Sequence, residues 1–97
     1  MSADNGIYIL RTKDNQIRVI HTKAIENIFD VYGEYIPKQI EKYFGNIPYT
    51  KDMNVANNIA QKMFKDIDYC EYGIRILPEC NKTWKEILKE AGKNIND

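Results

Sequence analysis

Apolar and polar positions near the start of the chain form a pattern that predicts a β-hairpin. The runs 7–11 (IYILR) and 16–20 (QIRVI) are rich in β-branched and aromatic residues, which favour strands. Asp14 and Asn15 lie between the two runs, and both residue types tolerate left-handed backbone angles. We therefore expect two antiparallel strands joined by a two-residue Asp14-Asn15 loop.

The register of this hairpin decides which side chains share a face of the sheet. A two-residue loop pairs Arg11 with Arg18 and Ile9 with Ile20. One face then carries Tyr8, Leu10, Ile17, Val19 and His21, and the other carries Ile7, Ile9, Ile20, Arg11 and Arg18. A three-residue loop would mix these sets. We favour the shorter loop because it keeps one aromatic-aliphatic set together.

Helical periodicity follows the hairpin. Residues 23–30 place apolar side chains on one side, and Thr22 suits the N-cap of that helix. Pro37 suits the first turn of a second helix, which ends before Gly45.

The clearest helical pattern covers residues 53–67, with Thr50 or Asp52 as its N-cap. Its apolar side chains recur every four residues, at Val55, Ile59, Met63 and Ile67, with Ala56, Ala60 and Phe64 alongside. We expect this stripe to face the core.

A strand and a helix complete the chain. The run 73–77 (GIRIL) predicts a third strand that Pro78 stops, and Asn81 suits the cap of a helix over 82–91. The apolar side of this last helix consists of Trp84, Ile87, Leu88 and Ala91. Such a stripe needs burial, either on the sheet or on a partner.

These elements, in the order ββααβα, predict an α+β fold. We expect a small antiparallel three-stranded sheet, made by the hairpin and the late strand, packed with about four helices. The length of 97 residues predicts a single domain over 1–97, with residues 79–97 as a C-terminal helical extension.

Charge and hydropathy narrow the function classes. The chain carries 14 Lys and Arg against 14 Asp and Glu, which argues against generic nucleic-acid binding. No apolar run approaches the roughly 20 residues that span a bilayer, and the start lacks the pattern of a signal peptide. We expect a cytoplasmic protein that does not bind a membrane.

The two cysteines, Cys70 and Cys80, flank the third predicted strand. Ten extended residues at about 3.3 Å each would separate them by about 30 Å, whereas a disulfide needs Cα atoms within roughly 7 Å. We expect two free thiols. The sequence contains no CxxC motif or Cys/His cluster that would indicate a metal site. It also contains no nucleotide-binding loop or hydrolase motif that would indicate a cofactor or a catalytic centre.

Arginines give the first candidate binding surface. In the favoured register Arg11 and Arg18 share a face with Ile9 and Ile20, and Arg75 can join them from the third strand. The guanidinium groups can simply cover apolar surface with their methylene stems. Alternatively, they form a partner face, or they hold an anion such as a nucleotide phosphate.

Polar residues at one end of the sheet give the second candidate. His21, Glu26 and Asn27 lie near the opening residues Asp4 and Asn5 in the predicted fold. His21 is either hydrogen-bonded at the corner between sheet and helix or, with Glu26, an acid–base pair. Asp4 and Asn5 either anchor the start of the chain through hydrogen bonds or line a ligand site.

Four segments within residues 2–78 resemble segments of a known protein family. The stretches SADNGIYIL, RVIHTKAIENI, YFGNIPYT and YGIRIL, in this order and spacing, resemble a family of small proteins encoded by bacteriophages and prophages. The opening nonapeptide is the most specific part. No biochemical activity is established for this family, so the resemblance assigns no catalytic residues. From Glu79 onward the chain departs from the family's pattern.

The resemblance implies a phage origin, and small phage proteins without enzyme motifs often disable a host system. We therefore expect a non-enzymatic inhibitor that binds a host defence protein, as anti-CRISPR proteins do. The alternative is a sponge that sequesters a nucleotide or another anionic signal. A homodimer is compatible with either function.

Overall fold

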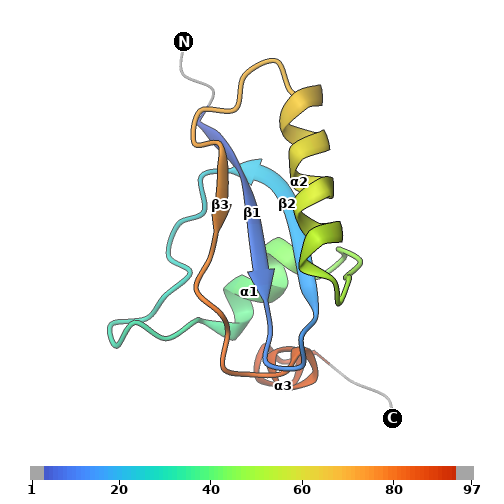
Figure 1. Cartoon of the computed structure of the whole chain (residues 1–97). Coiled ribbons are helices and arrows are strands. Elements are labelled where there is room, and N and C mark those ends of the chain that lie inside the picture. Colours follow the sequence, from blue (N-terminus) through green and yellow to red (C-terminus); the bar gives the residue numbers. More distant parts are fainter. Residues whose placement is uncertain (1–3, 94–97) are drawn as a thin grey trace.

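A three-stranded sheet lies at the centre of the computed structural model, which describes residues 4–93 (Figure 1). The elements in chain order are β1 (Asn5–Arg11), β2 (Ile17–Lys23), α1 (Pro37–Phe44), α2 (Met53–Asp66), β3 (Ile74–Ile76) and α3 (Trp84–Glu90). The α+β class and the order ββααβα are confirmed. The expected number of about four helices is wrong, since the described residues form three.

The sheet is mixed, so the expected all-antiparallel sheet is also wrong. The strand order is β2-β1-β3, with β1 antiparallel to β2 and parallel to β3. The chain leaves α2 at the end of the molecule where β1 begins, so β3 enters the sheet alongside β1 in the same direction (Figure 1). Backbone hydrogen bonds from Tyr72 to Asn5 and from Ile7 to Gly73, each 2.9 Å long, hold the entry to β3 against β1.

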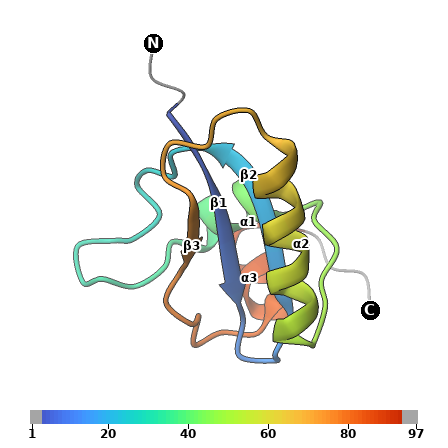
Figure 2. The same cartoon turned by 45° about the horizontal axis from the view of Figure 1, so that its top comes forward.

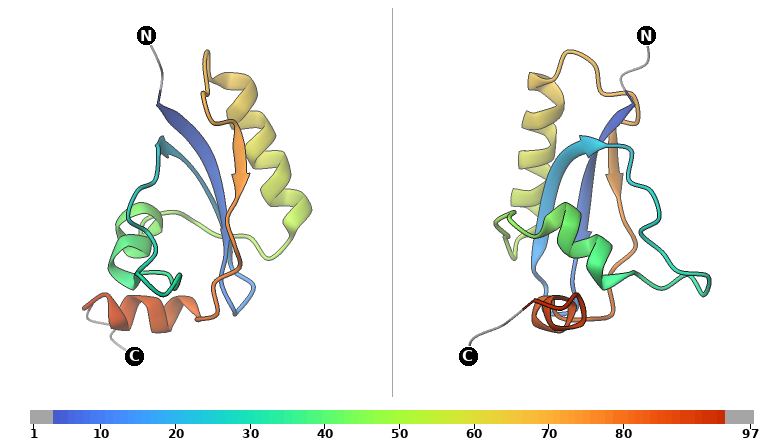
Figure 3. Two further views of the ribbon diagram at one scale, coloured as in Figure 1. Left: turned by 90° about the vertical axis from the view of Figure 1, so that its left-hand side faces the viewer. Right: turned by 180° about the vertical axis from the view of Figure 1, so that it is seen from behind.

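Helices cover both faces of the sheet. α2 packs on one face and α1 packs on the other, while α3 packs against α1 at the end of the sheet where the hairpin loop lies (Figure 3). The apolar side chains beneath α2 are Ile7, Ile9, Ile17, Val19, Ala56 and Ala60. The apolar core on the opposite side contains Tyr8, Leu10, Ile20, Ile28, Ile40, Phe44, Cys80 and Ile87. The central hairpin is therefore buried on both sides, although each strand is only seven residues long.

The hairpin itself is confirmed, but its predicted register is wrong by one residue. Leu10 pairs with Arg18 and Tyr8 pairs with Ile20. The Thr12 N–H donates to the Gln16 carbonyl at 3.1 Å, which leaves three residues in the loop. Asn15 adopts a positive φ of 59°. A three-residue hairpin loop commonly ends in a residue of this left-handed conformation, and Asn adopts it with little strain.

The helix expected at 23–30 does not form. Lys23 extends β2, Asn27 has a positive φ of 55°, and Phe29 pairs with Tyr35 in an isolated β-bridge. Ile28, which was expected on a helix face, enters the core beneath α1 as part of this irregular segment. The residues from 24 to 36 form a loop that projects from the side of the molecule (Figure 1).

The helices at 37–44 and 53–67 are confirmed, the second ending one residue earlier than expected. Pro37 occupies the first turn of α1. The Asp52 side chain accepts a hydrogen bond from the Asn54 N–H at 2.9 Å, so Asp52 rather than Thr50 caps α2. Capping of this kind satisfies a backbone donor that the helix leaves without a partner.

The third strand and the last helix are confirmed with shorter bounds, and the predicted cap at Asn81 is wrong. Thr83 caps α3 in a capping box with Glu86. Ile87 is buried in the same core cluster as Leu10 and Phe44. Residues 79–93 of the expected C-terminal extension are described, and α3 within them packs on α1. Glu79, at the start of this segment, lies beside Ile9 and Arg11. No helix in the described residues is both long and apolar enough to cross a membrane.

Candidate functional site

Arg18 is a structural residue within the fold. It is only 4% exposed, and its guanidinium carbon lies 3.6 Å from the centroid of the Trp84 ring and 5.3 Å from that of Tyr49. Its Nε donates to the Ile47 carbonyl at 3.1 Å, and Nη2 donates to the Gln16 side chain at 3.0 Å. Burial lowers the pKa of Arg18, and the charge of Asp14 offsets part of that change.

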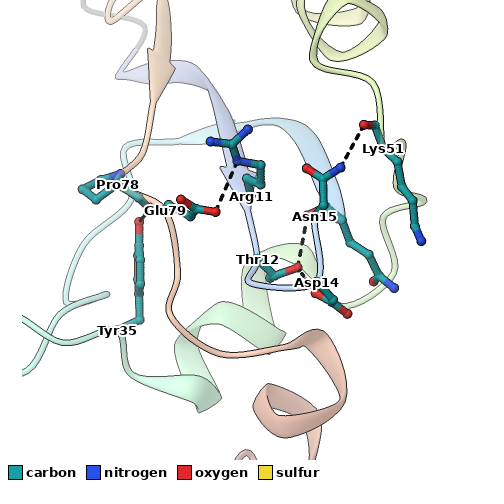
Figure 4. A network of polar contacts seen from close by, with 9 residues as sticks. Arg11, Thr12, Asp14, Asn15, Tyr35, Lys51, Pro78 and Glu79 are labelled. Atoms are coloured by element: carbon teal, nitrogen blue, oxygen red, sulfur yellow. Dashed lines mark hydrogen bonds and ion pairs between the residues drawn. The ribbon is translucent and has the colours of Figure 1, made fainter.

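The predicted arginine face does not form. The one-residue change in register places Arg11 and Arg18 on opposite faces of the sheet. Arg11 forms an ion pair with Glu79 at 3.5 Å (Figure 4), and Arg75 is exposed on the edge strand β3, where its Nε donates to the Tyr72 carbonyl at 3.3 Å. Three guanidinium groups in these positions cannot grip one phosphate together.

Ile9 and Ile20 are also separated. Ile9 is buried beneath α2, and Ile20 is buried in the core on the opposite face. Neither side chain is available to a partner, so the predicted surface of isoleucines ringed by arginines is wrong.

Asp4 and Asn5 are held by the loop that leads into β3. The Tyr72 hydroxyl donates to the Asp4 carboxylate at 3.1 Å, and the Asn5 side-chain amide donates to the Tyr69 carbonyl at 3.2 Å. The Ala24 N–H donates to the Asp4 carbonyl at 3.2 Å. These contacts attach the start of β1 to both neighbouring segments, which is the anchoring role expected for the two residues.

His21, Glu26 and Asn27 are all exposed. Within the described residues, no hydrogen bond or ion pair joins them to one another or to Asp4 and Asn5. The polar cluster predicted at this end of the sheet is therefore not joined by hydrogen bonds or ion pairs among its described residues. An acid–base pair of His21 and Glu26 has no geometric support.

The surface with the shape of a binding site lies between α2 and the segment that connects α1 to α2. A groove of about 360 Å³ opens there. Ile17 and Val19 of β2 contribute to it from the sheet, and Val55, Ile59 and Met63 line it from α2. The connecting segment contributes Ile47, Pro48, Tyr49 and Thr50. Figure 2 shows α2 lying alongside β2 over this side of the sheet.

This groove uses the residues that the sequence pattern assigned to the core. Ala56 and Ala60 are the fully buried side chains of α2, whereas Val55 and Ile59 are 42% and 40% exposed. The small alanine side chains let the helix approach the sheet closely, and the larger apolar stripe is turned toward the edge of β2. A signal was present in the sequence, because two alanines spaced four residues apart mark a close-packed helix face.

Two other features of the surface lie outside this groove. A hollow of about 600 Å³ is lined by Ile36, Lys38, Gln39, Glu41 and Lys42, so α1 and its N-cap residue supply all of its lining. The projecting loop exposes Val31 and Tyr32 almost completely, at 92% and 86%. Asp30 orders that loop by accepting hydrogen bonds from the N–H groups of Tyr32 and Glu34.

Cys70 and Cys80 are both free thiols, as expected. Within residues 4–93, no three His, Cys, Asp or Glu side chains gather into a group that could hold a metal ion. Comparison of the chain with protein-family models, with curated proteins and with solved structures finds no match.

Proposed function

We propose that the chain is a phage-encoded, non-enzymatic binding protein that inhibits a host defence system through protein–protein contact, in the manner of an anti-CRISPR protein. The observation that carries the proposal is the apolar groove between α2 and the edge of β2. A groove with a mainly apolar lining and a few polar groups is the usual shape of a binding site. The phage origin rests on the resemblance of residues 2–78.

The charge of the chain fits a protein partner better than a nucleic acid. The net charge is zero, and the most buried arginine, Arg18, stacks on Trp84 instead of facing solvent. The site of action would be the cytoplasm of the infected host, where a defence complex is available to it.

A plaque assay tests the proposal. The chain is expressed in a panel of bacterial strains that each carry one defence system, including CRISPR–Cas systems, and each strain is challenged with a phage that its system restricts. We expect phage plating to recover in one strain and the purified chain to bind a component of that system. Restored plating in none of the strains, together with no direct binding to their purified components, would overturn it.

The alternative, a nucleotide sponge, was based on a cluster of three arginines that does not form. No observation in the described residues replaces that cluster, because Arg11 and Arg18 lie on opposite faces and Arg75 lies on the outer edge of β3. We therefore expect no thermal stabilisation by cyclic nucleotides. A clear rise of the unfolding midpoint would restore the alternative.

A further inference from the structure

The edge of β2 that faces away from β1 carries backbone groups without partners. Successive residues of an antiparallel strand direct their N–H and C=O groups alternately to its two sides. Ile17 directs its groups outward, since its N–H donates to the Thr50 carbonyl at 2.8 Å and its carbonyl accepts from the Thr50 N–H at 2.9 Å. Val19, His21 and Lys23 must then face outward as well. Among residues 4–93, no hydrogen bond satisfies these outward groups.

Pro48 explains why the pairing between β2 and the connecting segment stops after the Ile17–Thr50 bridge. Extending the Ile17–Thr50 bridge by two residues would place Pro48 opposite Val19. Proline has no N–H to donate, so it cannot continue the ladder. The connecting segment thus pairs with β2 only at Thr50 and covers Val19, which is 6% exposed, but it leaves the edge open at His21 and Lys23.

The other edge of the sheet is a poorer template. β3 has only three residues and is followed closely by Pro78, both of which protect an edge against pairing. The exposed end of β2, at His21 and Lys23, has no proline after it and adjoins the apolar groove that Ile17 and Val19 line. An open strand edge beside a groove lined by a helix is the arrangement that accepts an extended peptide as an added strand.

Charge around the groove indicates the composition of the peptide. His21 and Lys23 continue the α2 side of β2 beyond Val19, and helical spacing places Lys62 and Asp66 on the same flank of α2 as Ile59. The ammonium groups of Lys23 and Lys62 form no ion pair within the described residues. Two lysines against one aspartate favour an acidic side chain on the partner next to its apolar ones.

We propose that an extended segment of the partner protein adds to the exposed outer edge of β2 at His21 and Lys23, next to the end of the groove that Val19 lines. Alternate apolar side chains of that segment enter the groove beside Ile59, and an acidic residue pairs with Lys23 or Lys62. This inference rests on the proposed function, because it names the surface and the peptide chemistry through which the inhibitor would hold its target.

A peptide library tests this site without knowledge of the host target. Peptides of about twelve residues, long enough to form one added strand, are displayed and selected against the full chain. We expect selected sequences with apolar residues at alternate positions and an Asp or Glu nearby. The absence of any selected peptide would overturn the proposal.

Four matched variants locate the binding of a selected peptide. His21→Pro removes an outward N–H without touching the bonds to β1, and Ile59→Lys places a charge in the groove. We expect each to weaken binding about tenfold or more, a loss typical of a central contact. His21→Ala keeps the N–H, and Phe64→Lys lies on the opposite flank of α2 with an exposure of 45%, close to the 40% of Ile59. Both controls should bind nearly as the parent chain does.

Amide hydrogen exchange of the complex supplies an independent measurement. The outward N–H groups of His21 and Lys23 should become protected when the peptide binds, as a new strand requires. Unchanged exchange at these amides, or equal binding by His21→Pro and the parent chain, would overturn the proposal. Dimerisation of the free chain that His21→Pro abolishes would also overturn it, because a second copy would then occupy the edge.

The same variants separate this inference from the proposed function. If Ile59→Lys and His21→Pro still restore phage plating, the inhibitor binds its target elsewhere and only the docking site is wrong. If selected peptides bind as expected while the parent chain restores plating in no strain, the site is right and the defence role is wrong.

Discussion

The guanidinium carbon of Arg18 lies over the indole of Trp84, 3.6 Å from the ring centroid, and this contact joins the central hairpin to the C-terminal helix. The two residues are 66 positions apart in the chain. The contact buries a charged group among apolar side chains, where a cation above an aromatic face is stabilised by the charge distribution of the ring.

Trp84→Ala should lower the free energy of unfolding by about 3 kcal/mol, because it removes a large side chain that packs on the core. A double-mutant cycle with Arg18→Ala should give a coupling energy of about 1–2 kcal/mol. Urea unfolding of the parent, the two single variants and the double variant measures both quantities. Tyr32→Ala, at a position 86% exposed, is the control and should change stability by less than about 0.5 kcal/mol. Strict additivity would show that the stacking contributes nothing.

The hairpin loop should depend on the backbone of Asn15 more than on its side chain. Asn15→Val should be about 1–2 kcal/mol less stable than Asn15→Gly, because a β-branched residue strains the positive φ whereas glycine does not. Both variants lose the same side-chain hydrogen bond to the Lys51 carbonyl, which Figure 4 shows, so their difference isolates the backbone. Thermal unfolding measures it. Equal midpoints would contradict the three-residue loop.

The two thiols should react differently. Cys80 is 1% exposed, and burial raises the pKa of its thiol, so the folded state favours the unreactive neutral form. The contribution of the neutral Cys80 thiol to the stability of the fold is therefore fully present below the pKa of an unfolded cysteine. It is lost as the pH rises through the higher pKa of the folded state. At pH 8 we expect a thiol reagent to label Cys70 in the folded protein and Cys80 only after denaturation. Rapid labelling of Cys80 in the native protein would contradict this packing.

Tyr72 should ionise later than an ordinary tyrosine. The carboxylates of Glu71 and Asp4, the second of which accepts a hydrogen bond from the Tyr72 hydroxyl at 3.1 Å, raise the pKa of Tyr72 to about 12. Because the folded pKa lies above the ordinary value of 10.0, this stabilisation is complete below pH 10 and is lost between pH 10 and 12. Ultraviolet titration should show that Tyr72→Phe removes a late phenolate transition. Glu71→Gln and Asp4→Asn should each move that transition to lower pH, and an unchanged transition in both would show that these carboxylates do not act on Tyr72.

Local chemistry within the sequence determined most of the secondary structure. Pro37 begins α1, Asp52 caps α2, and the pattern of apolar residues over 53–67 predicted the longest helix within one residue of its end. These features are predictable because they depend on neighbours in the chain: a fixed φ at proline, a carboxylate near free backbone N–H groups, and a period that matches the helical turn. The hairpin was predictable for the same reason, although its register was not.

Tertiary structure decided the rest, and through it the candidate site. One additional loop residue, permitted by the left-handed backbone of Asn15, reversed which side chains share a face and moved Arg18 beneath Trp84. Residues 23–30 carry a helical pattern, yet pairing with β1 and burial of Ile28 gave them other partners. The periodicity of α2 could not say that Ala56 and Ala60 would face the sheet while Val55 and Ile59 remained at the groove. Each outcome depends on contacts between residues far apart in the chain, and a pattern of neighbouring residues carries no measure of their energies.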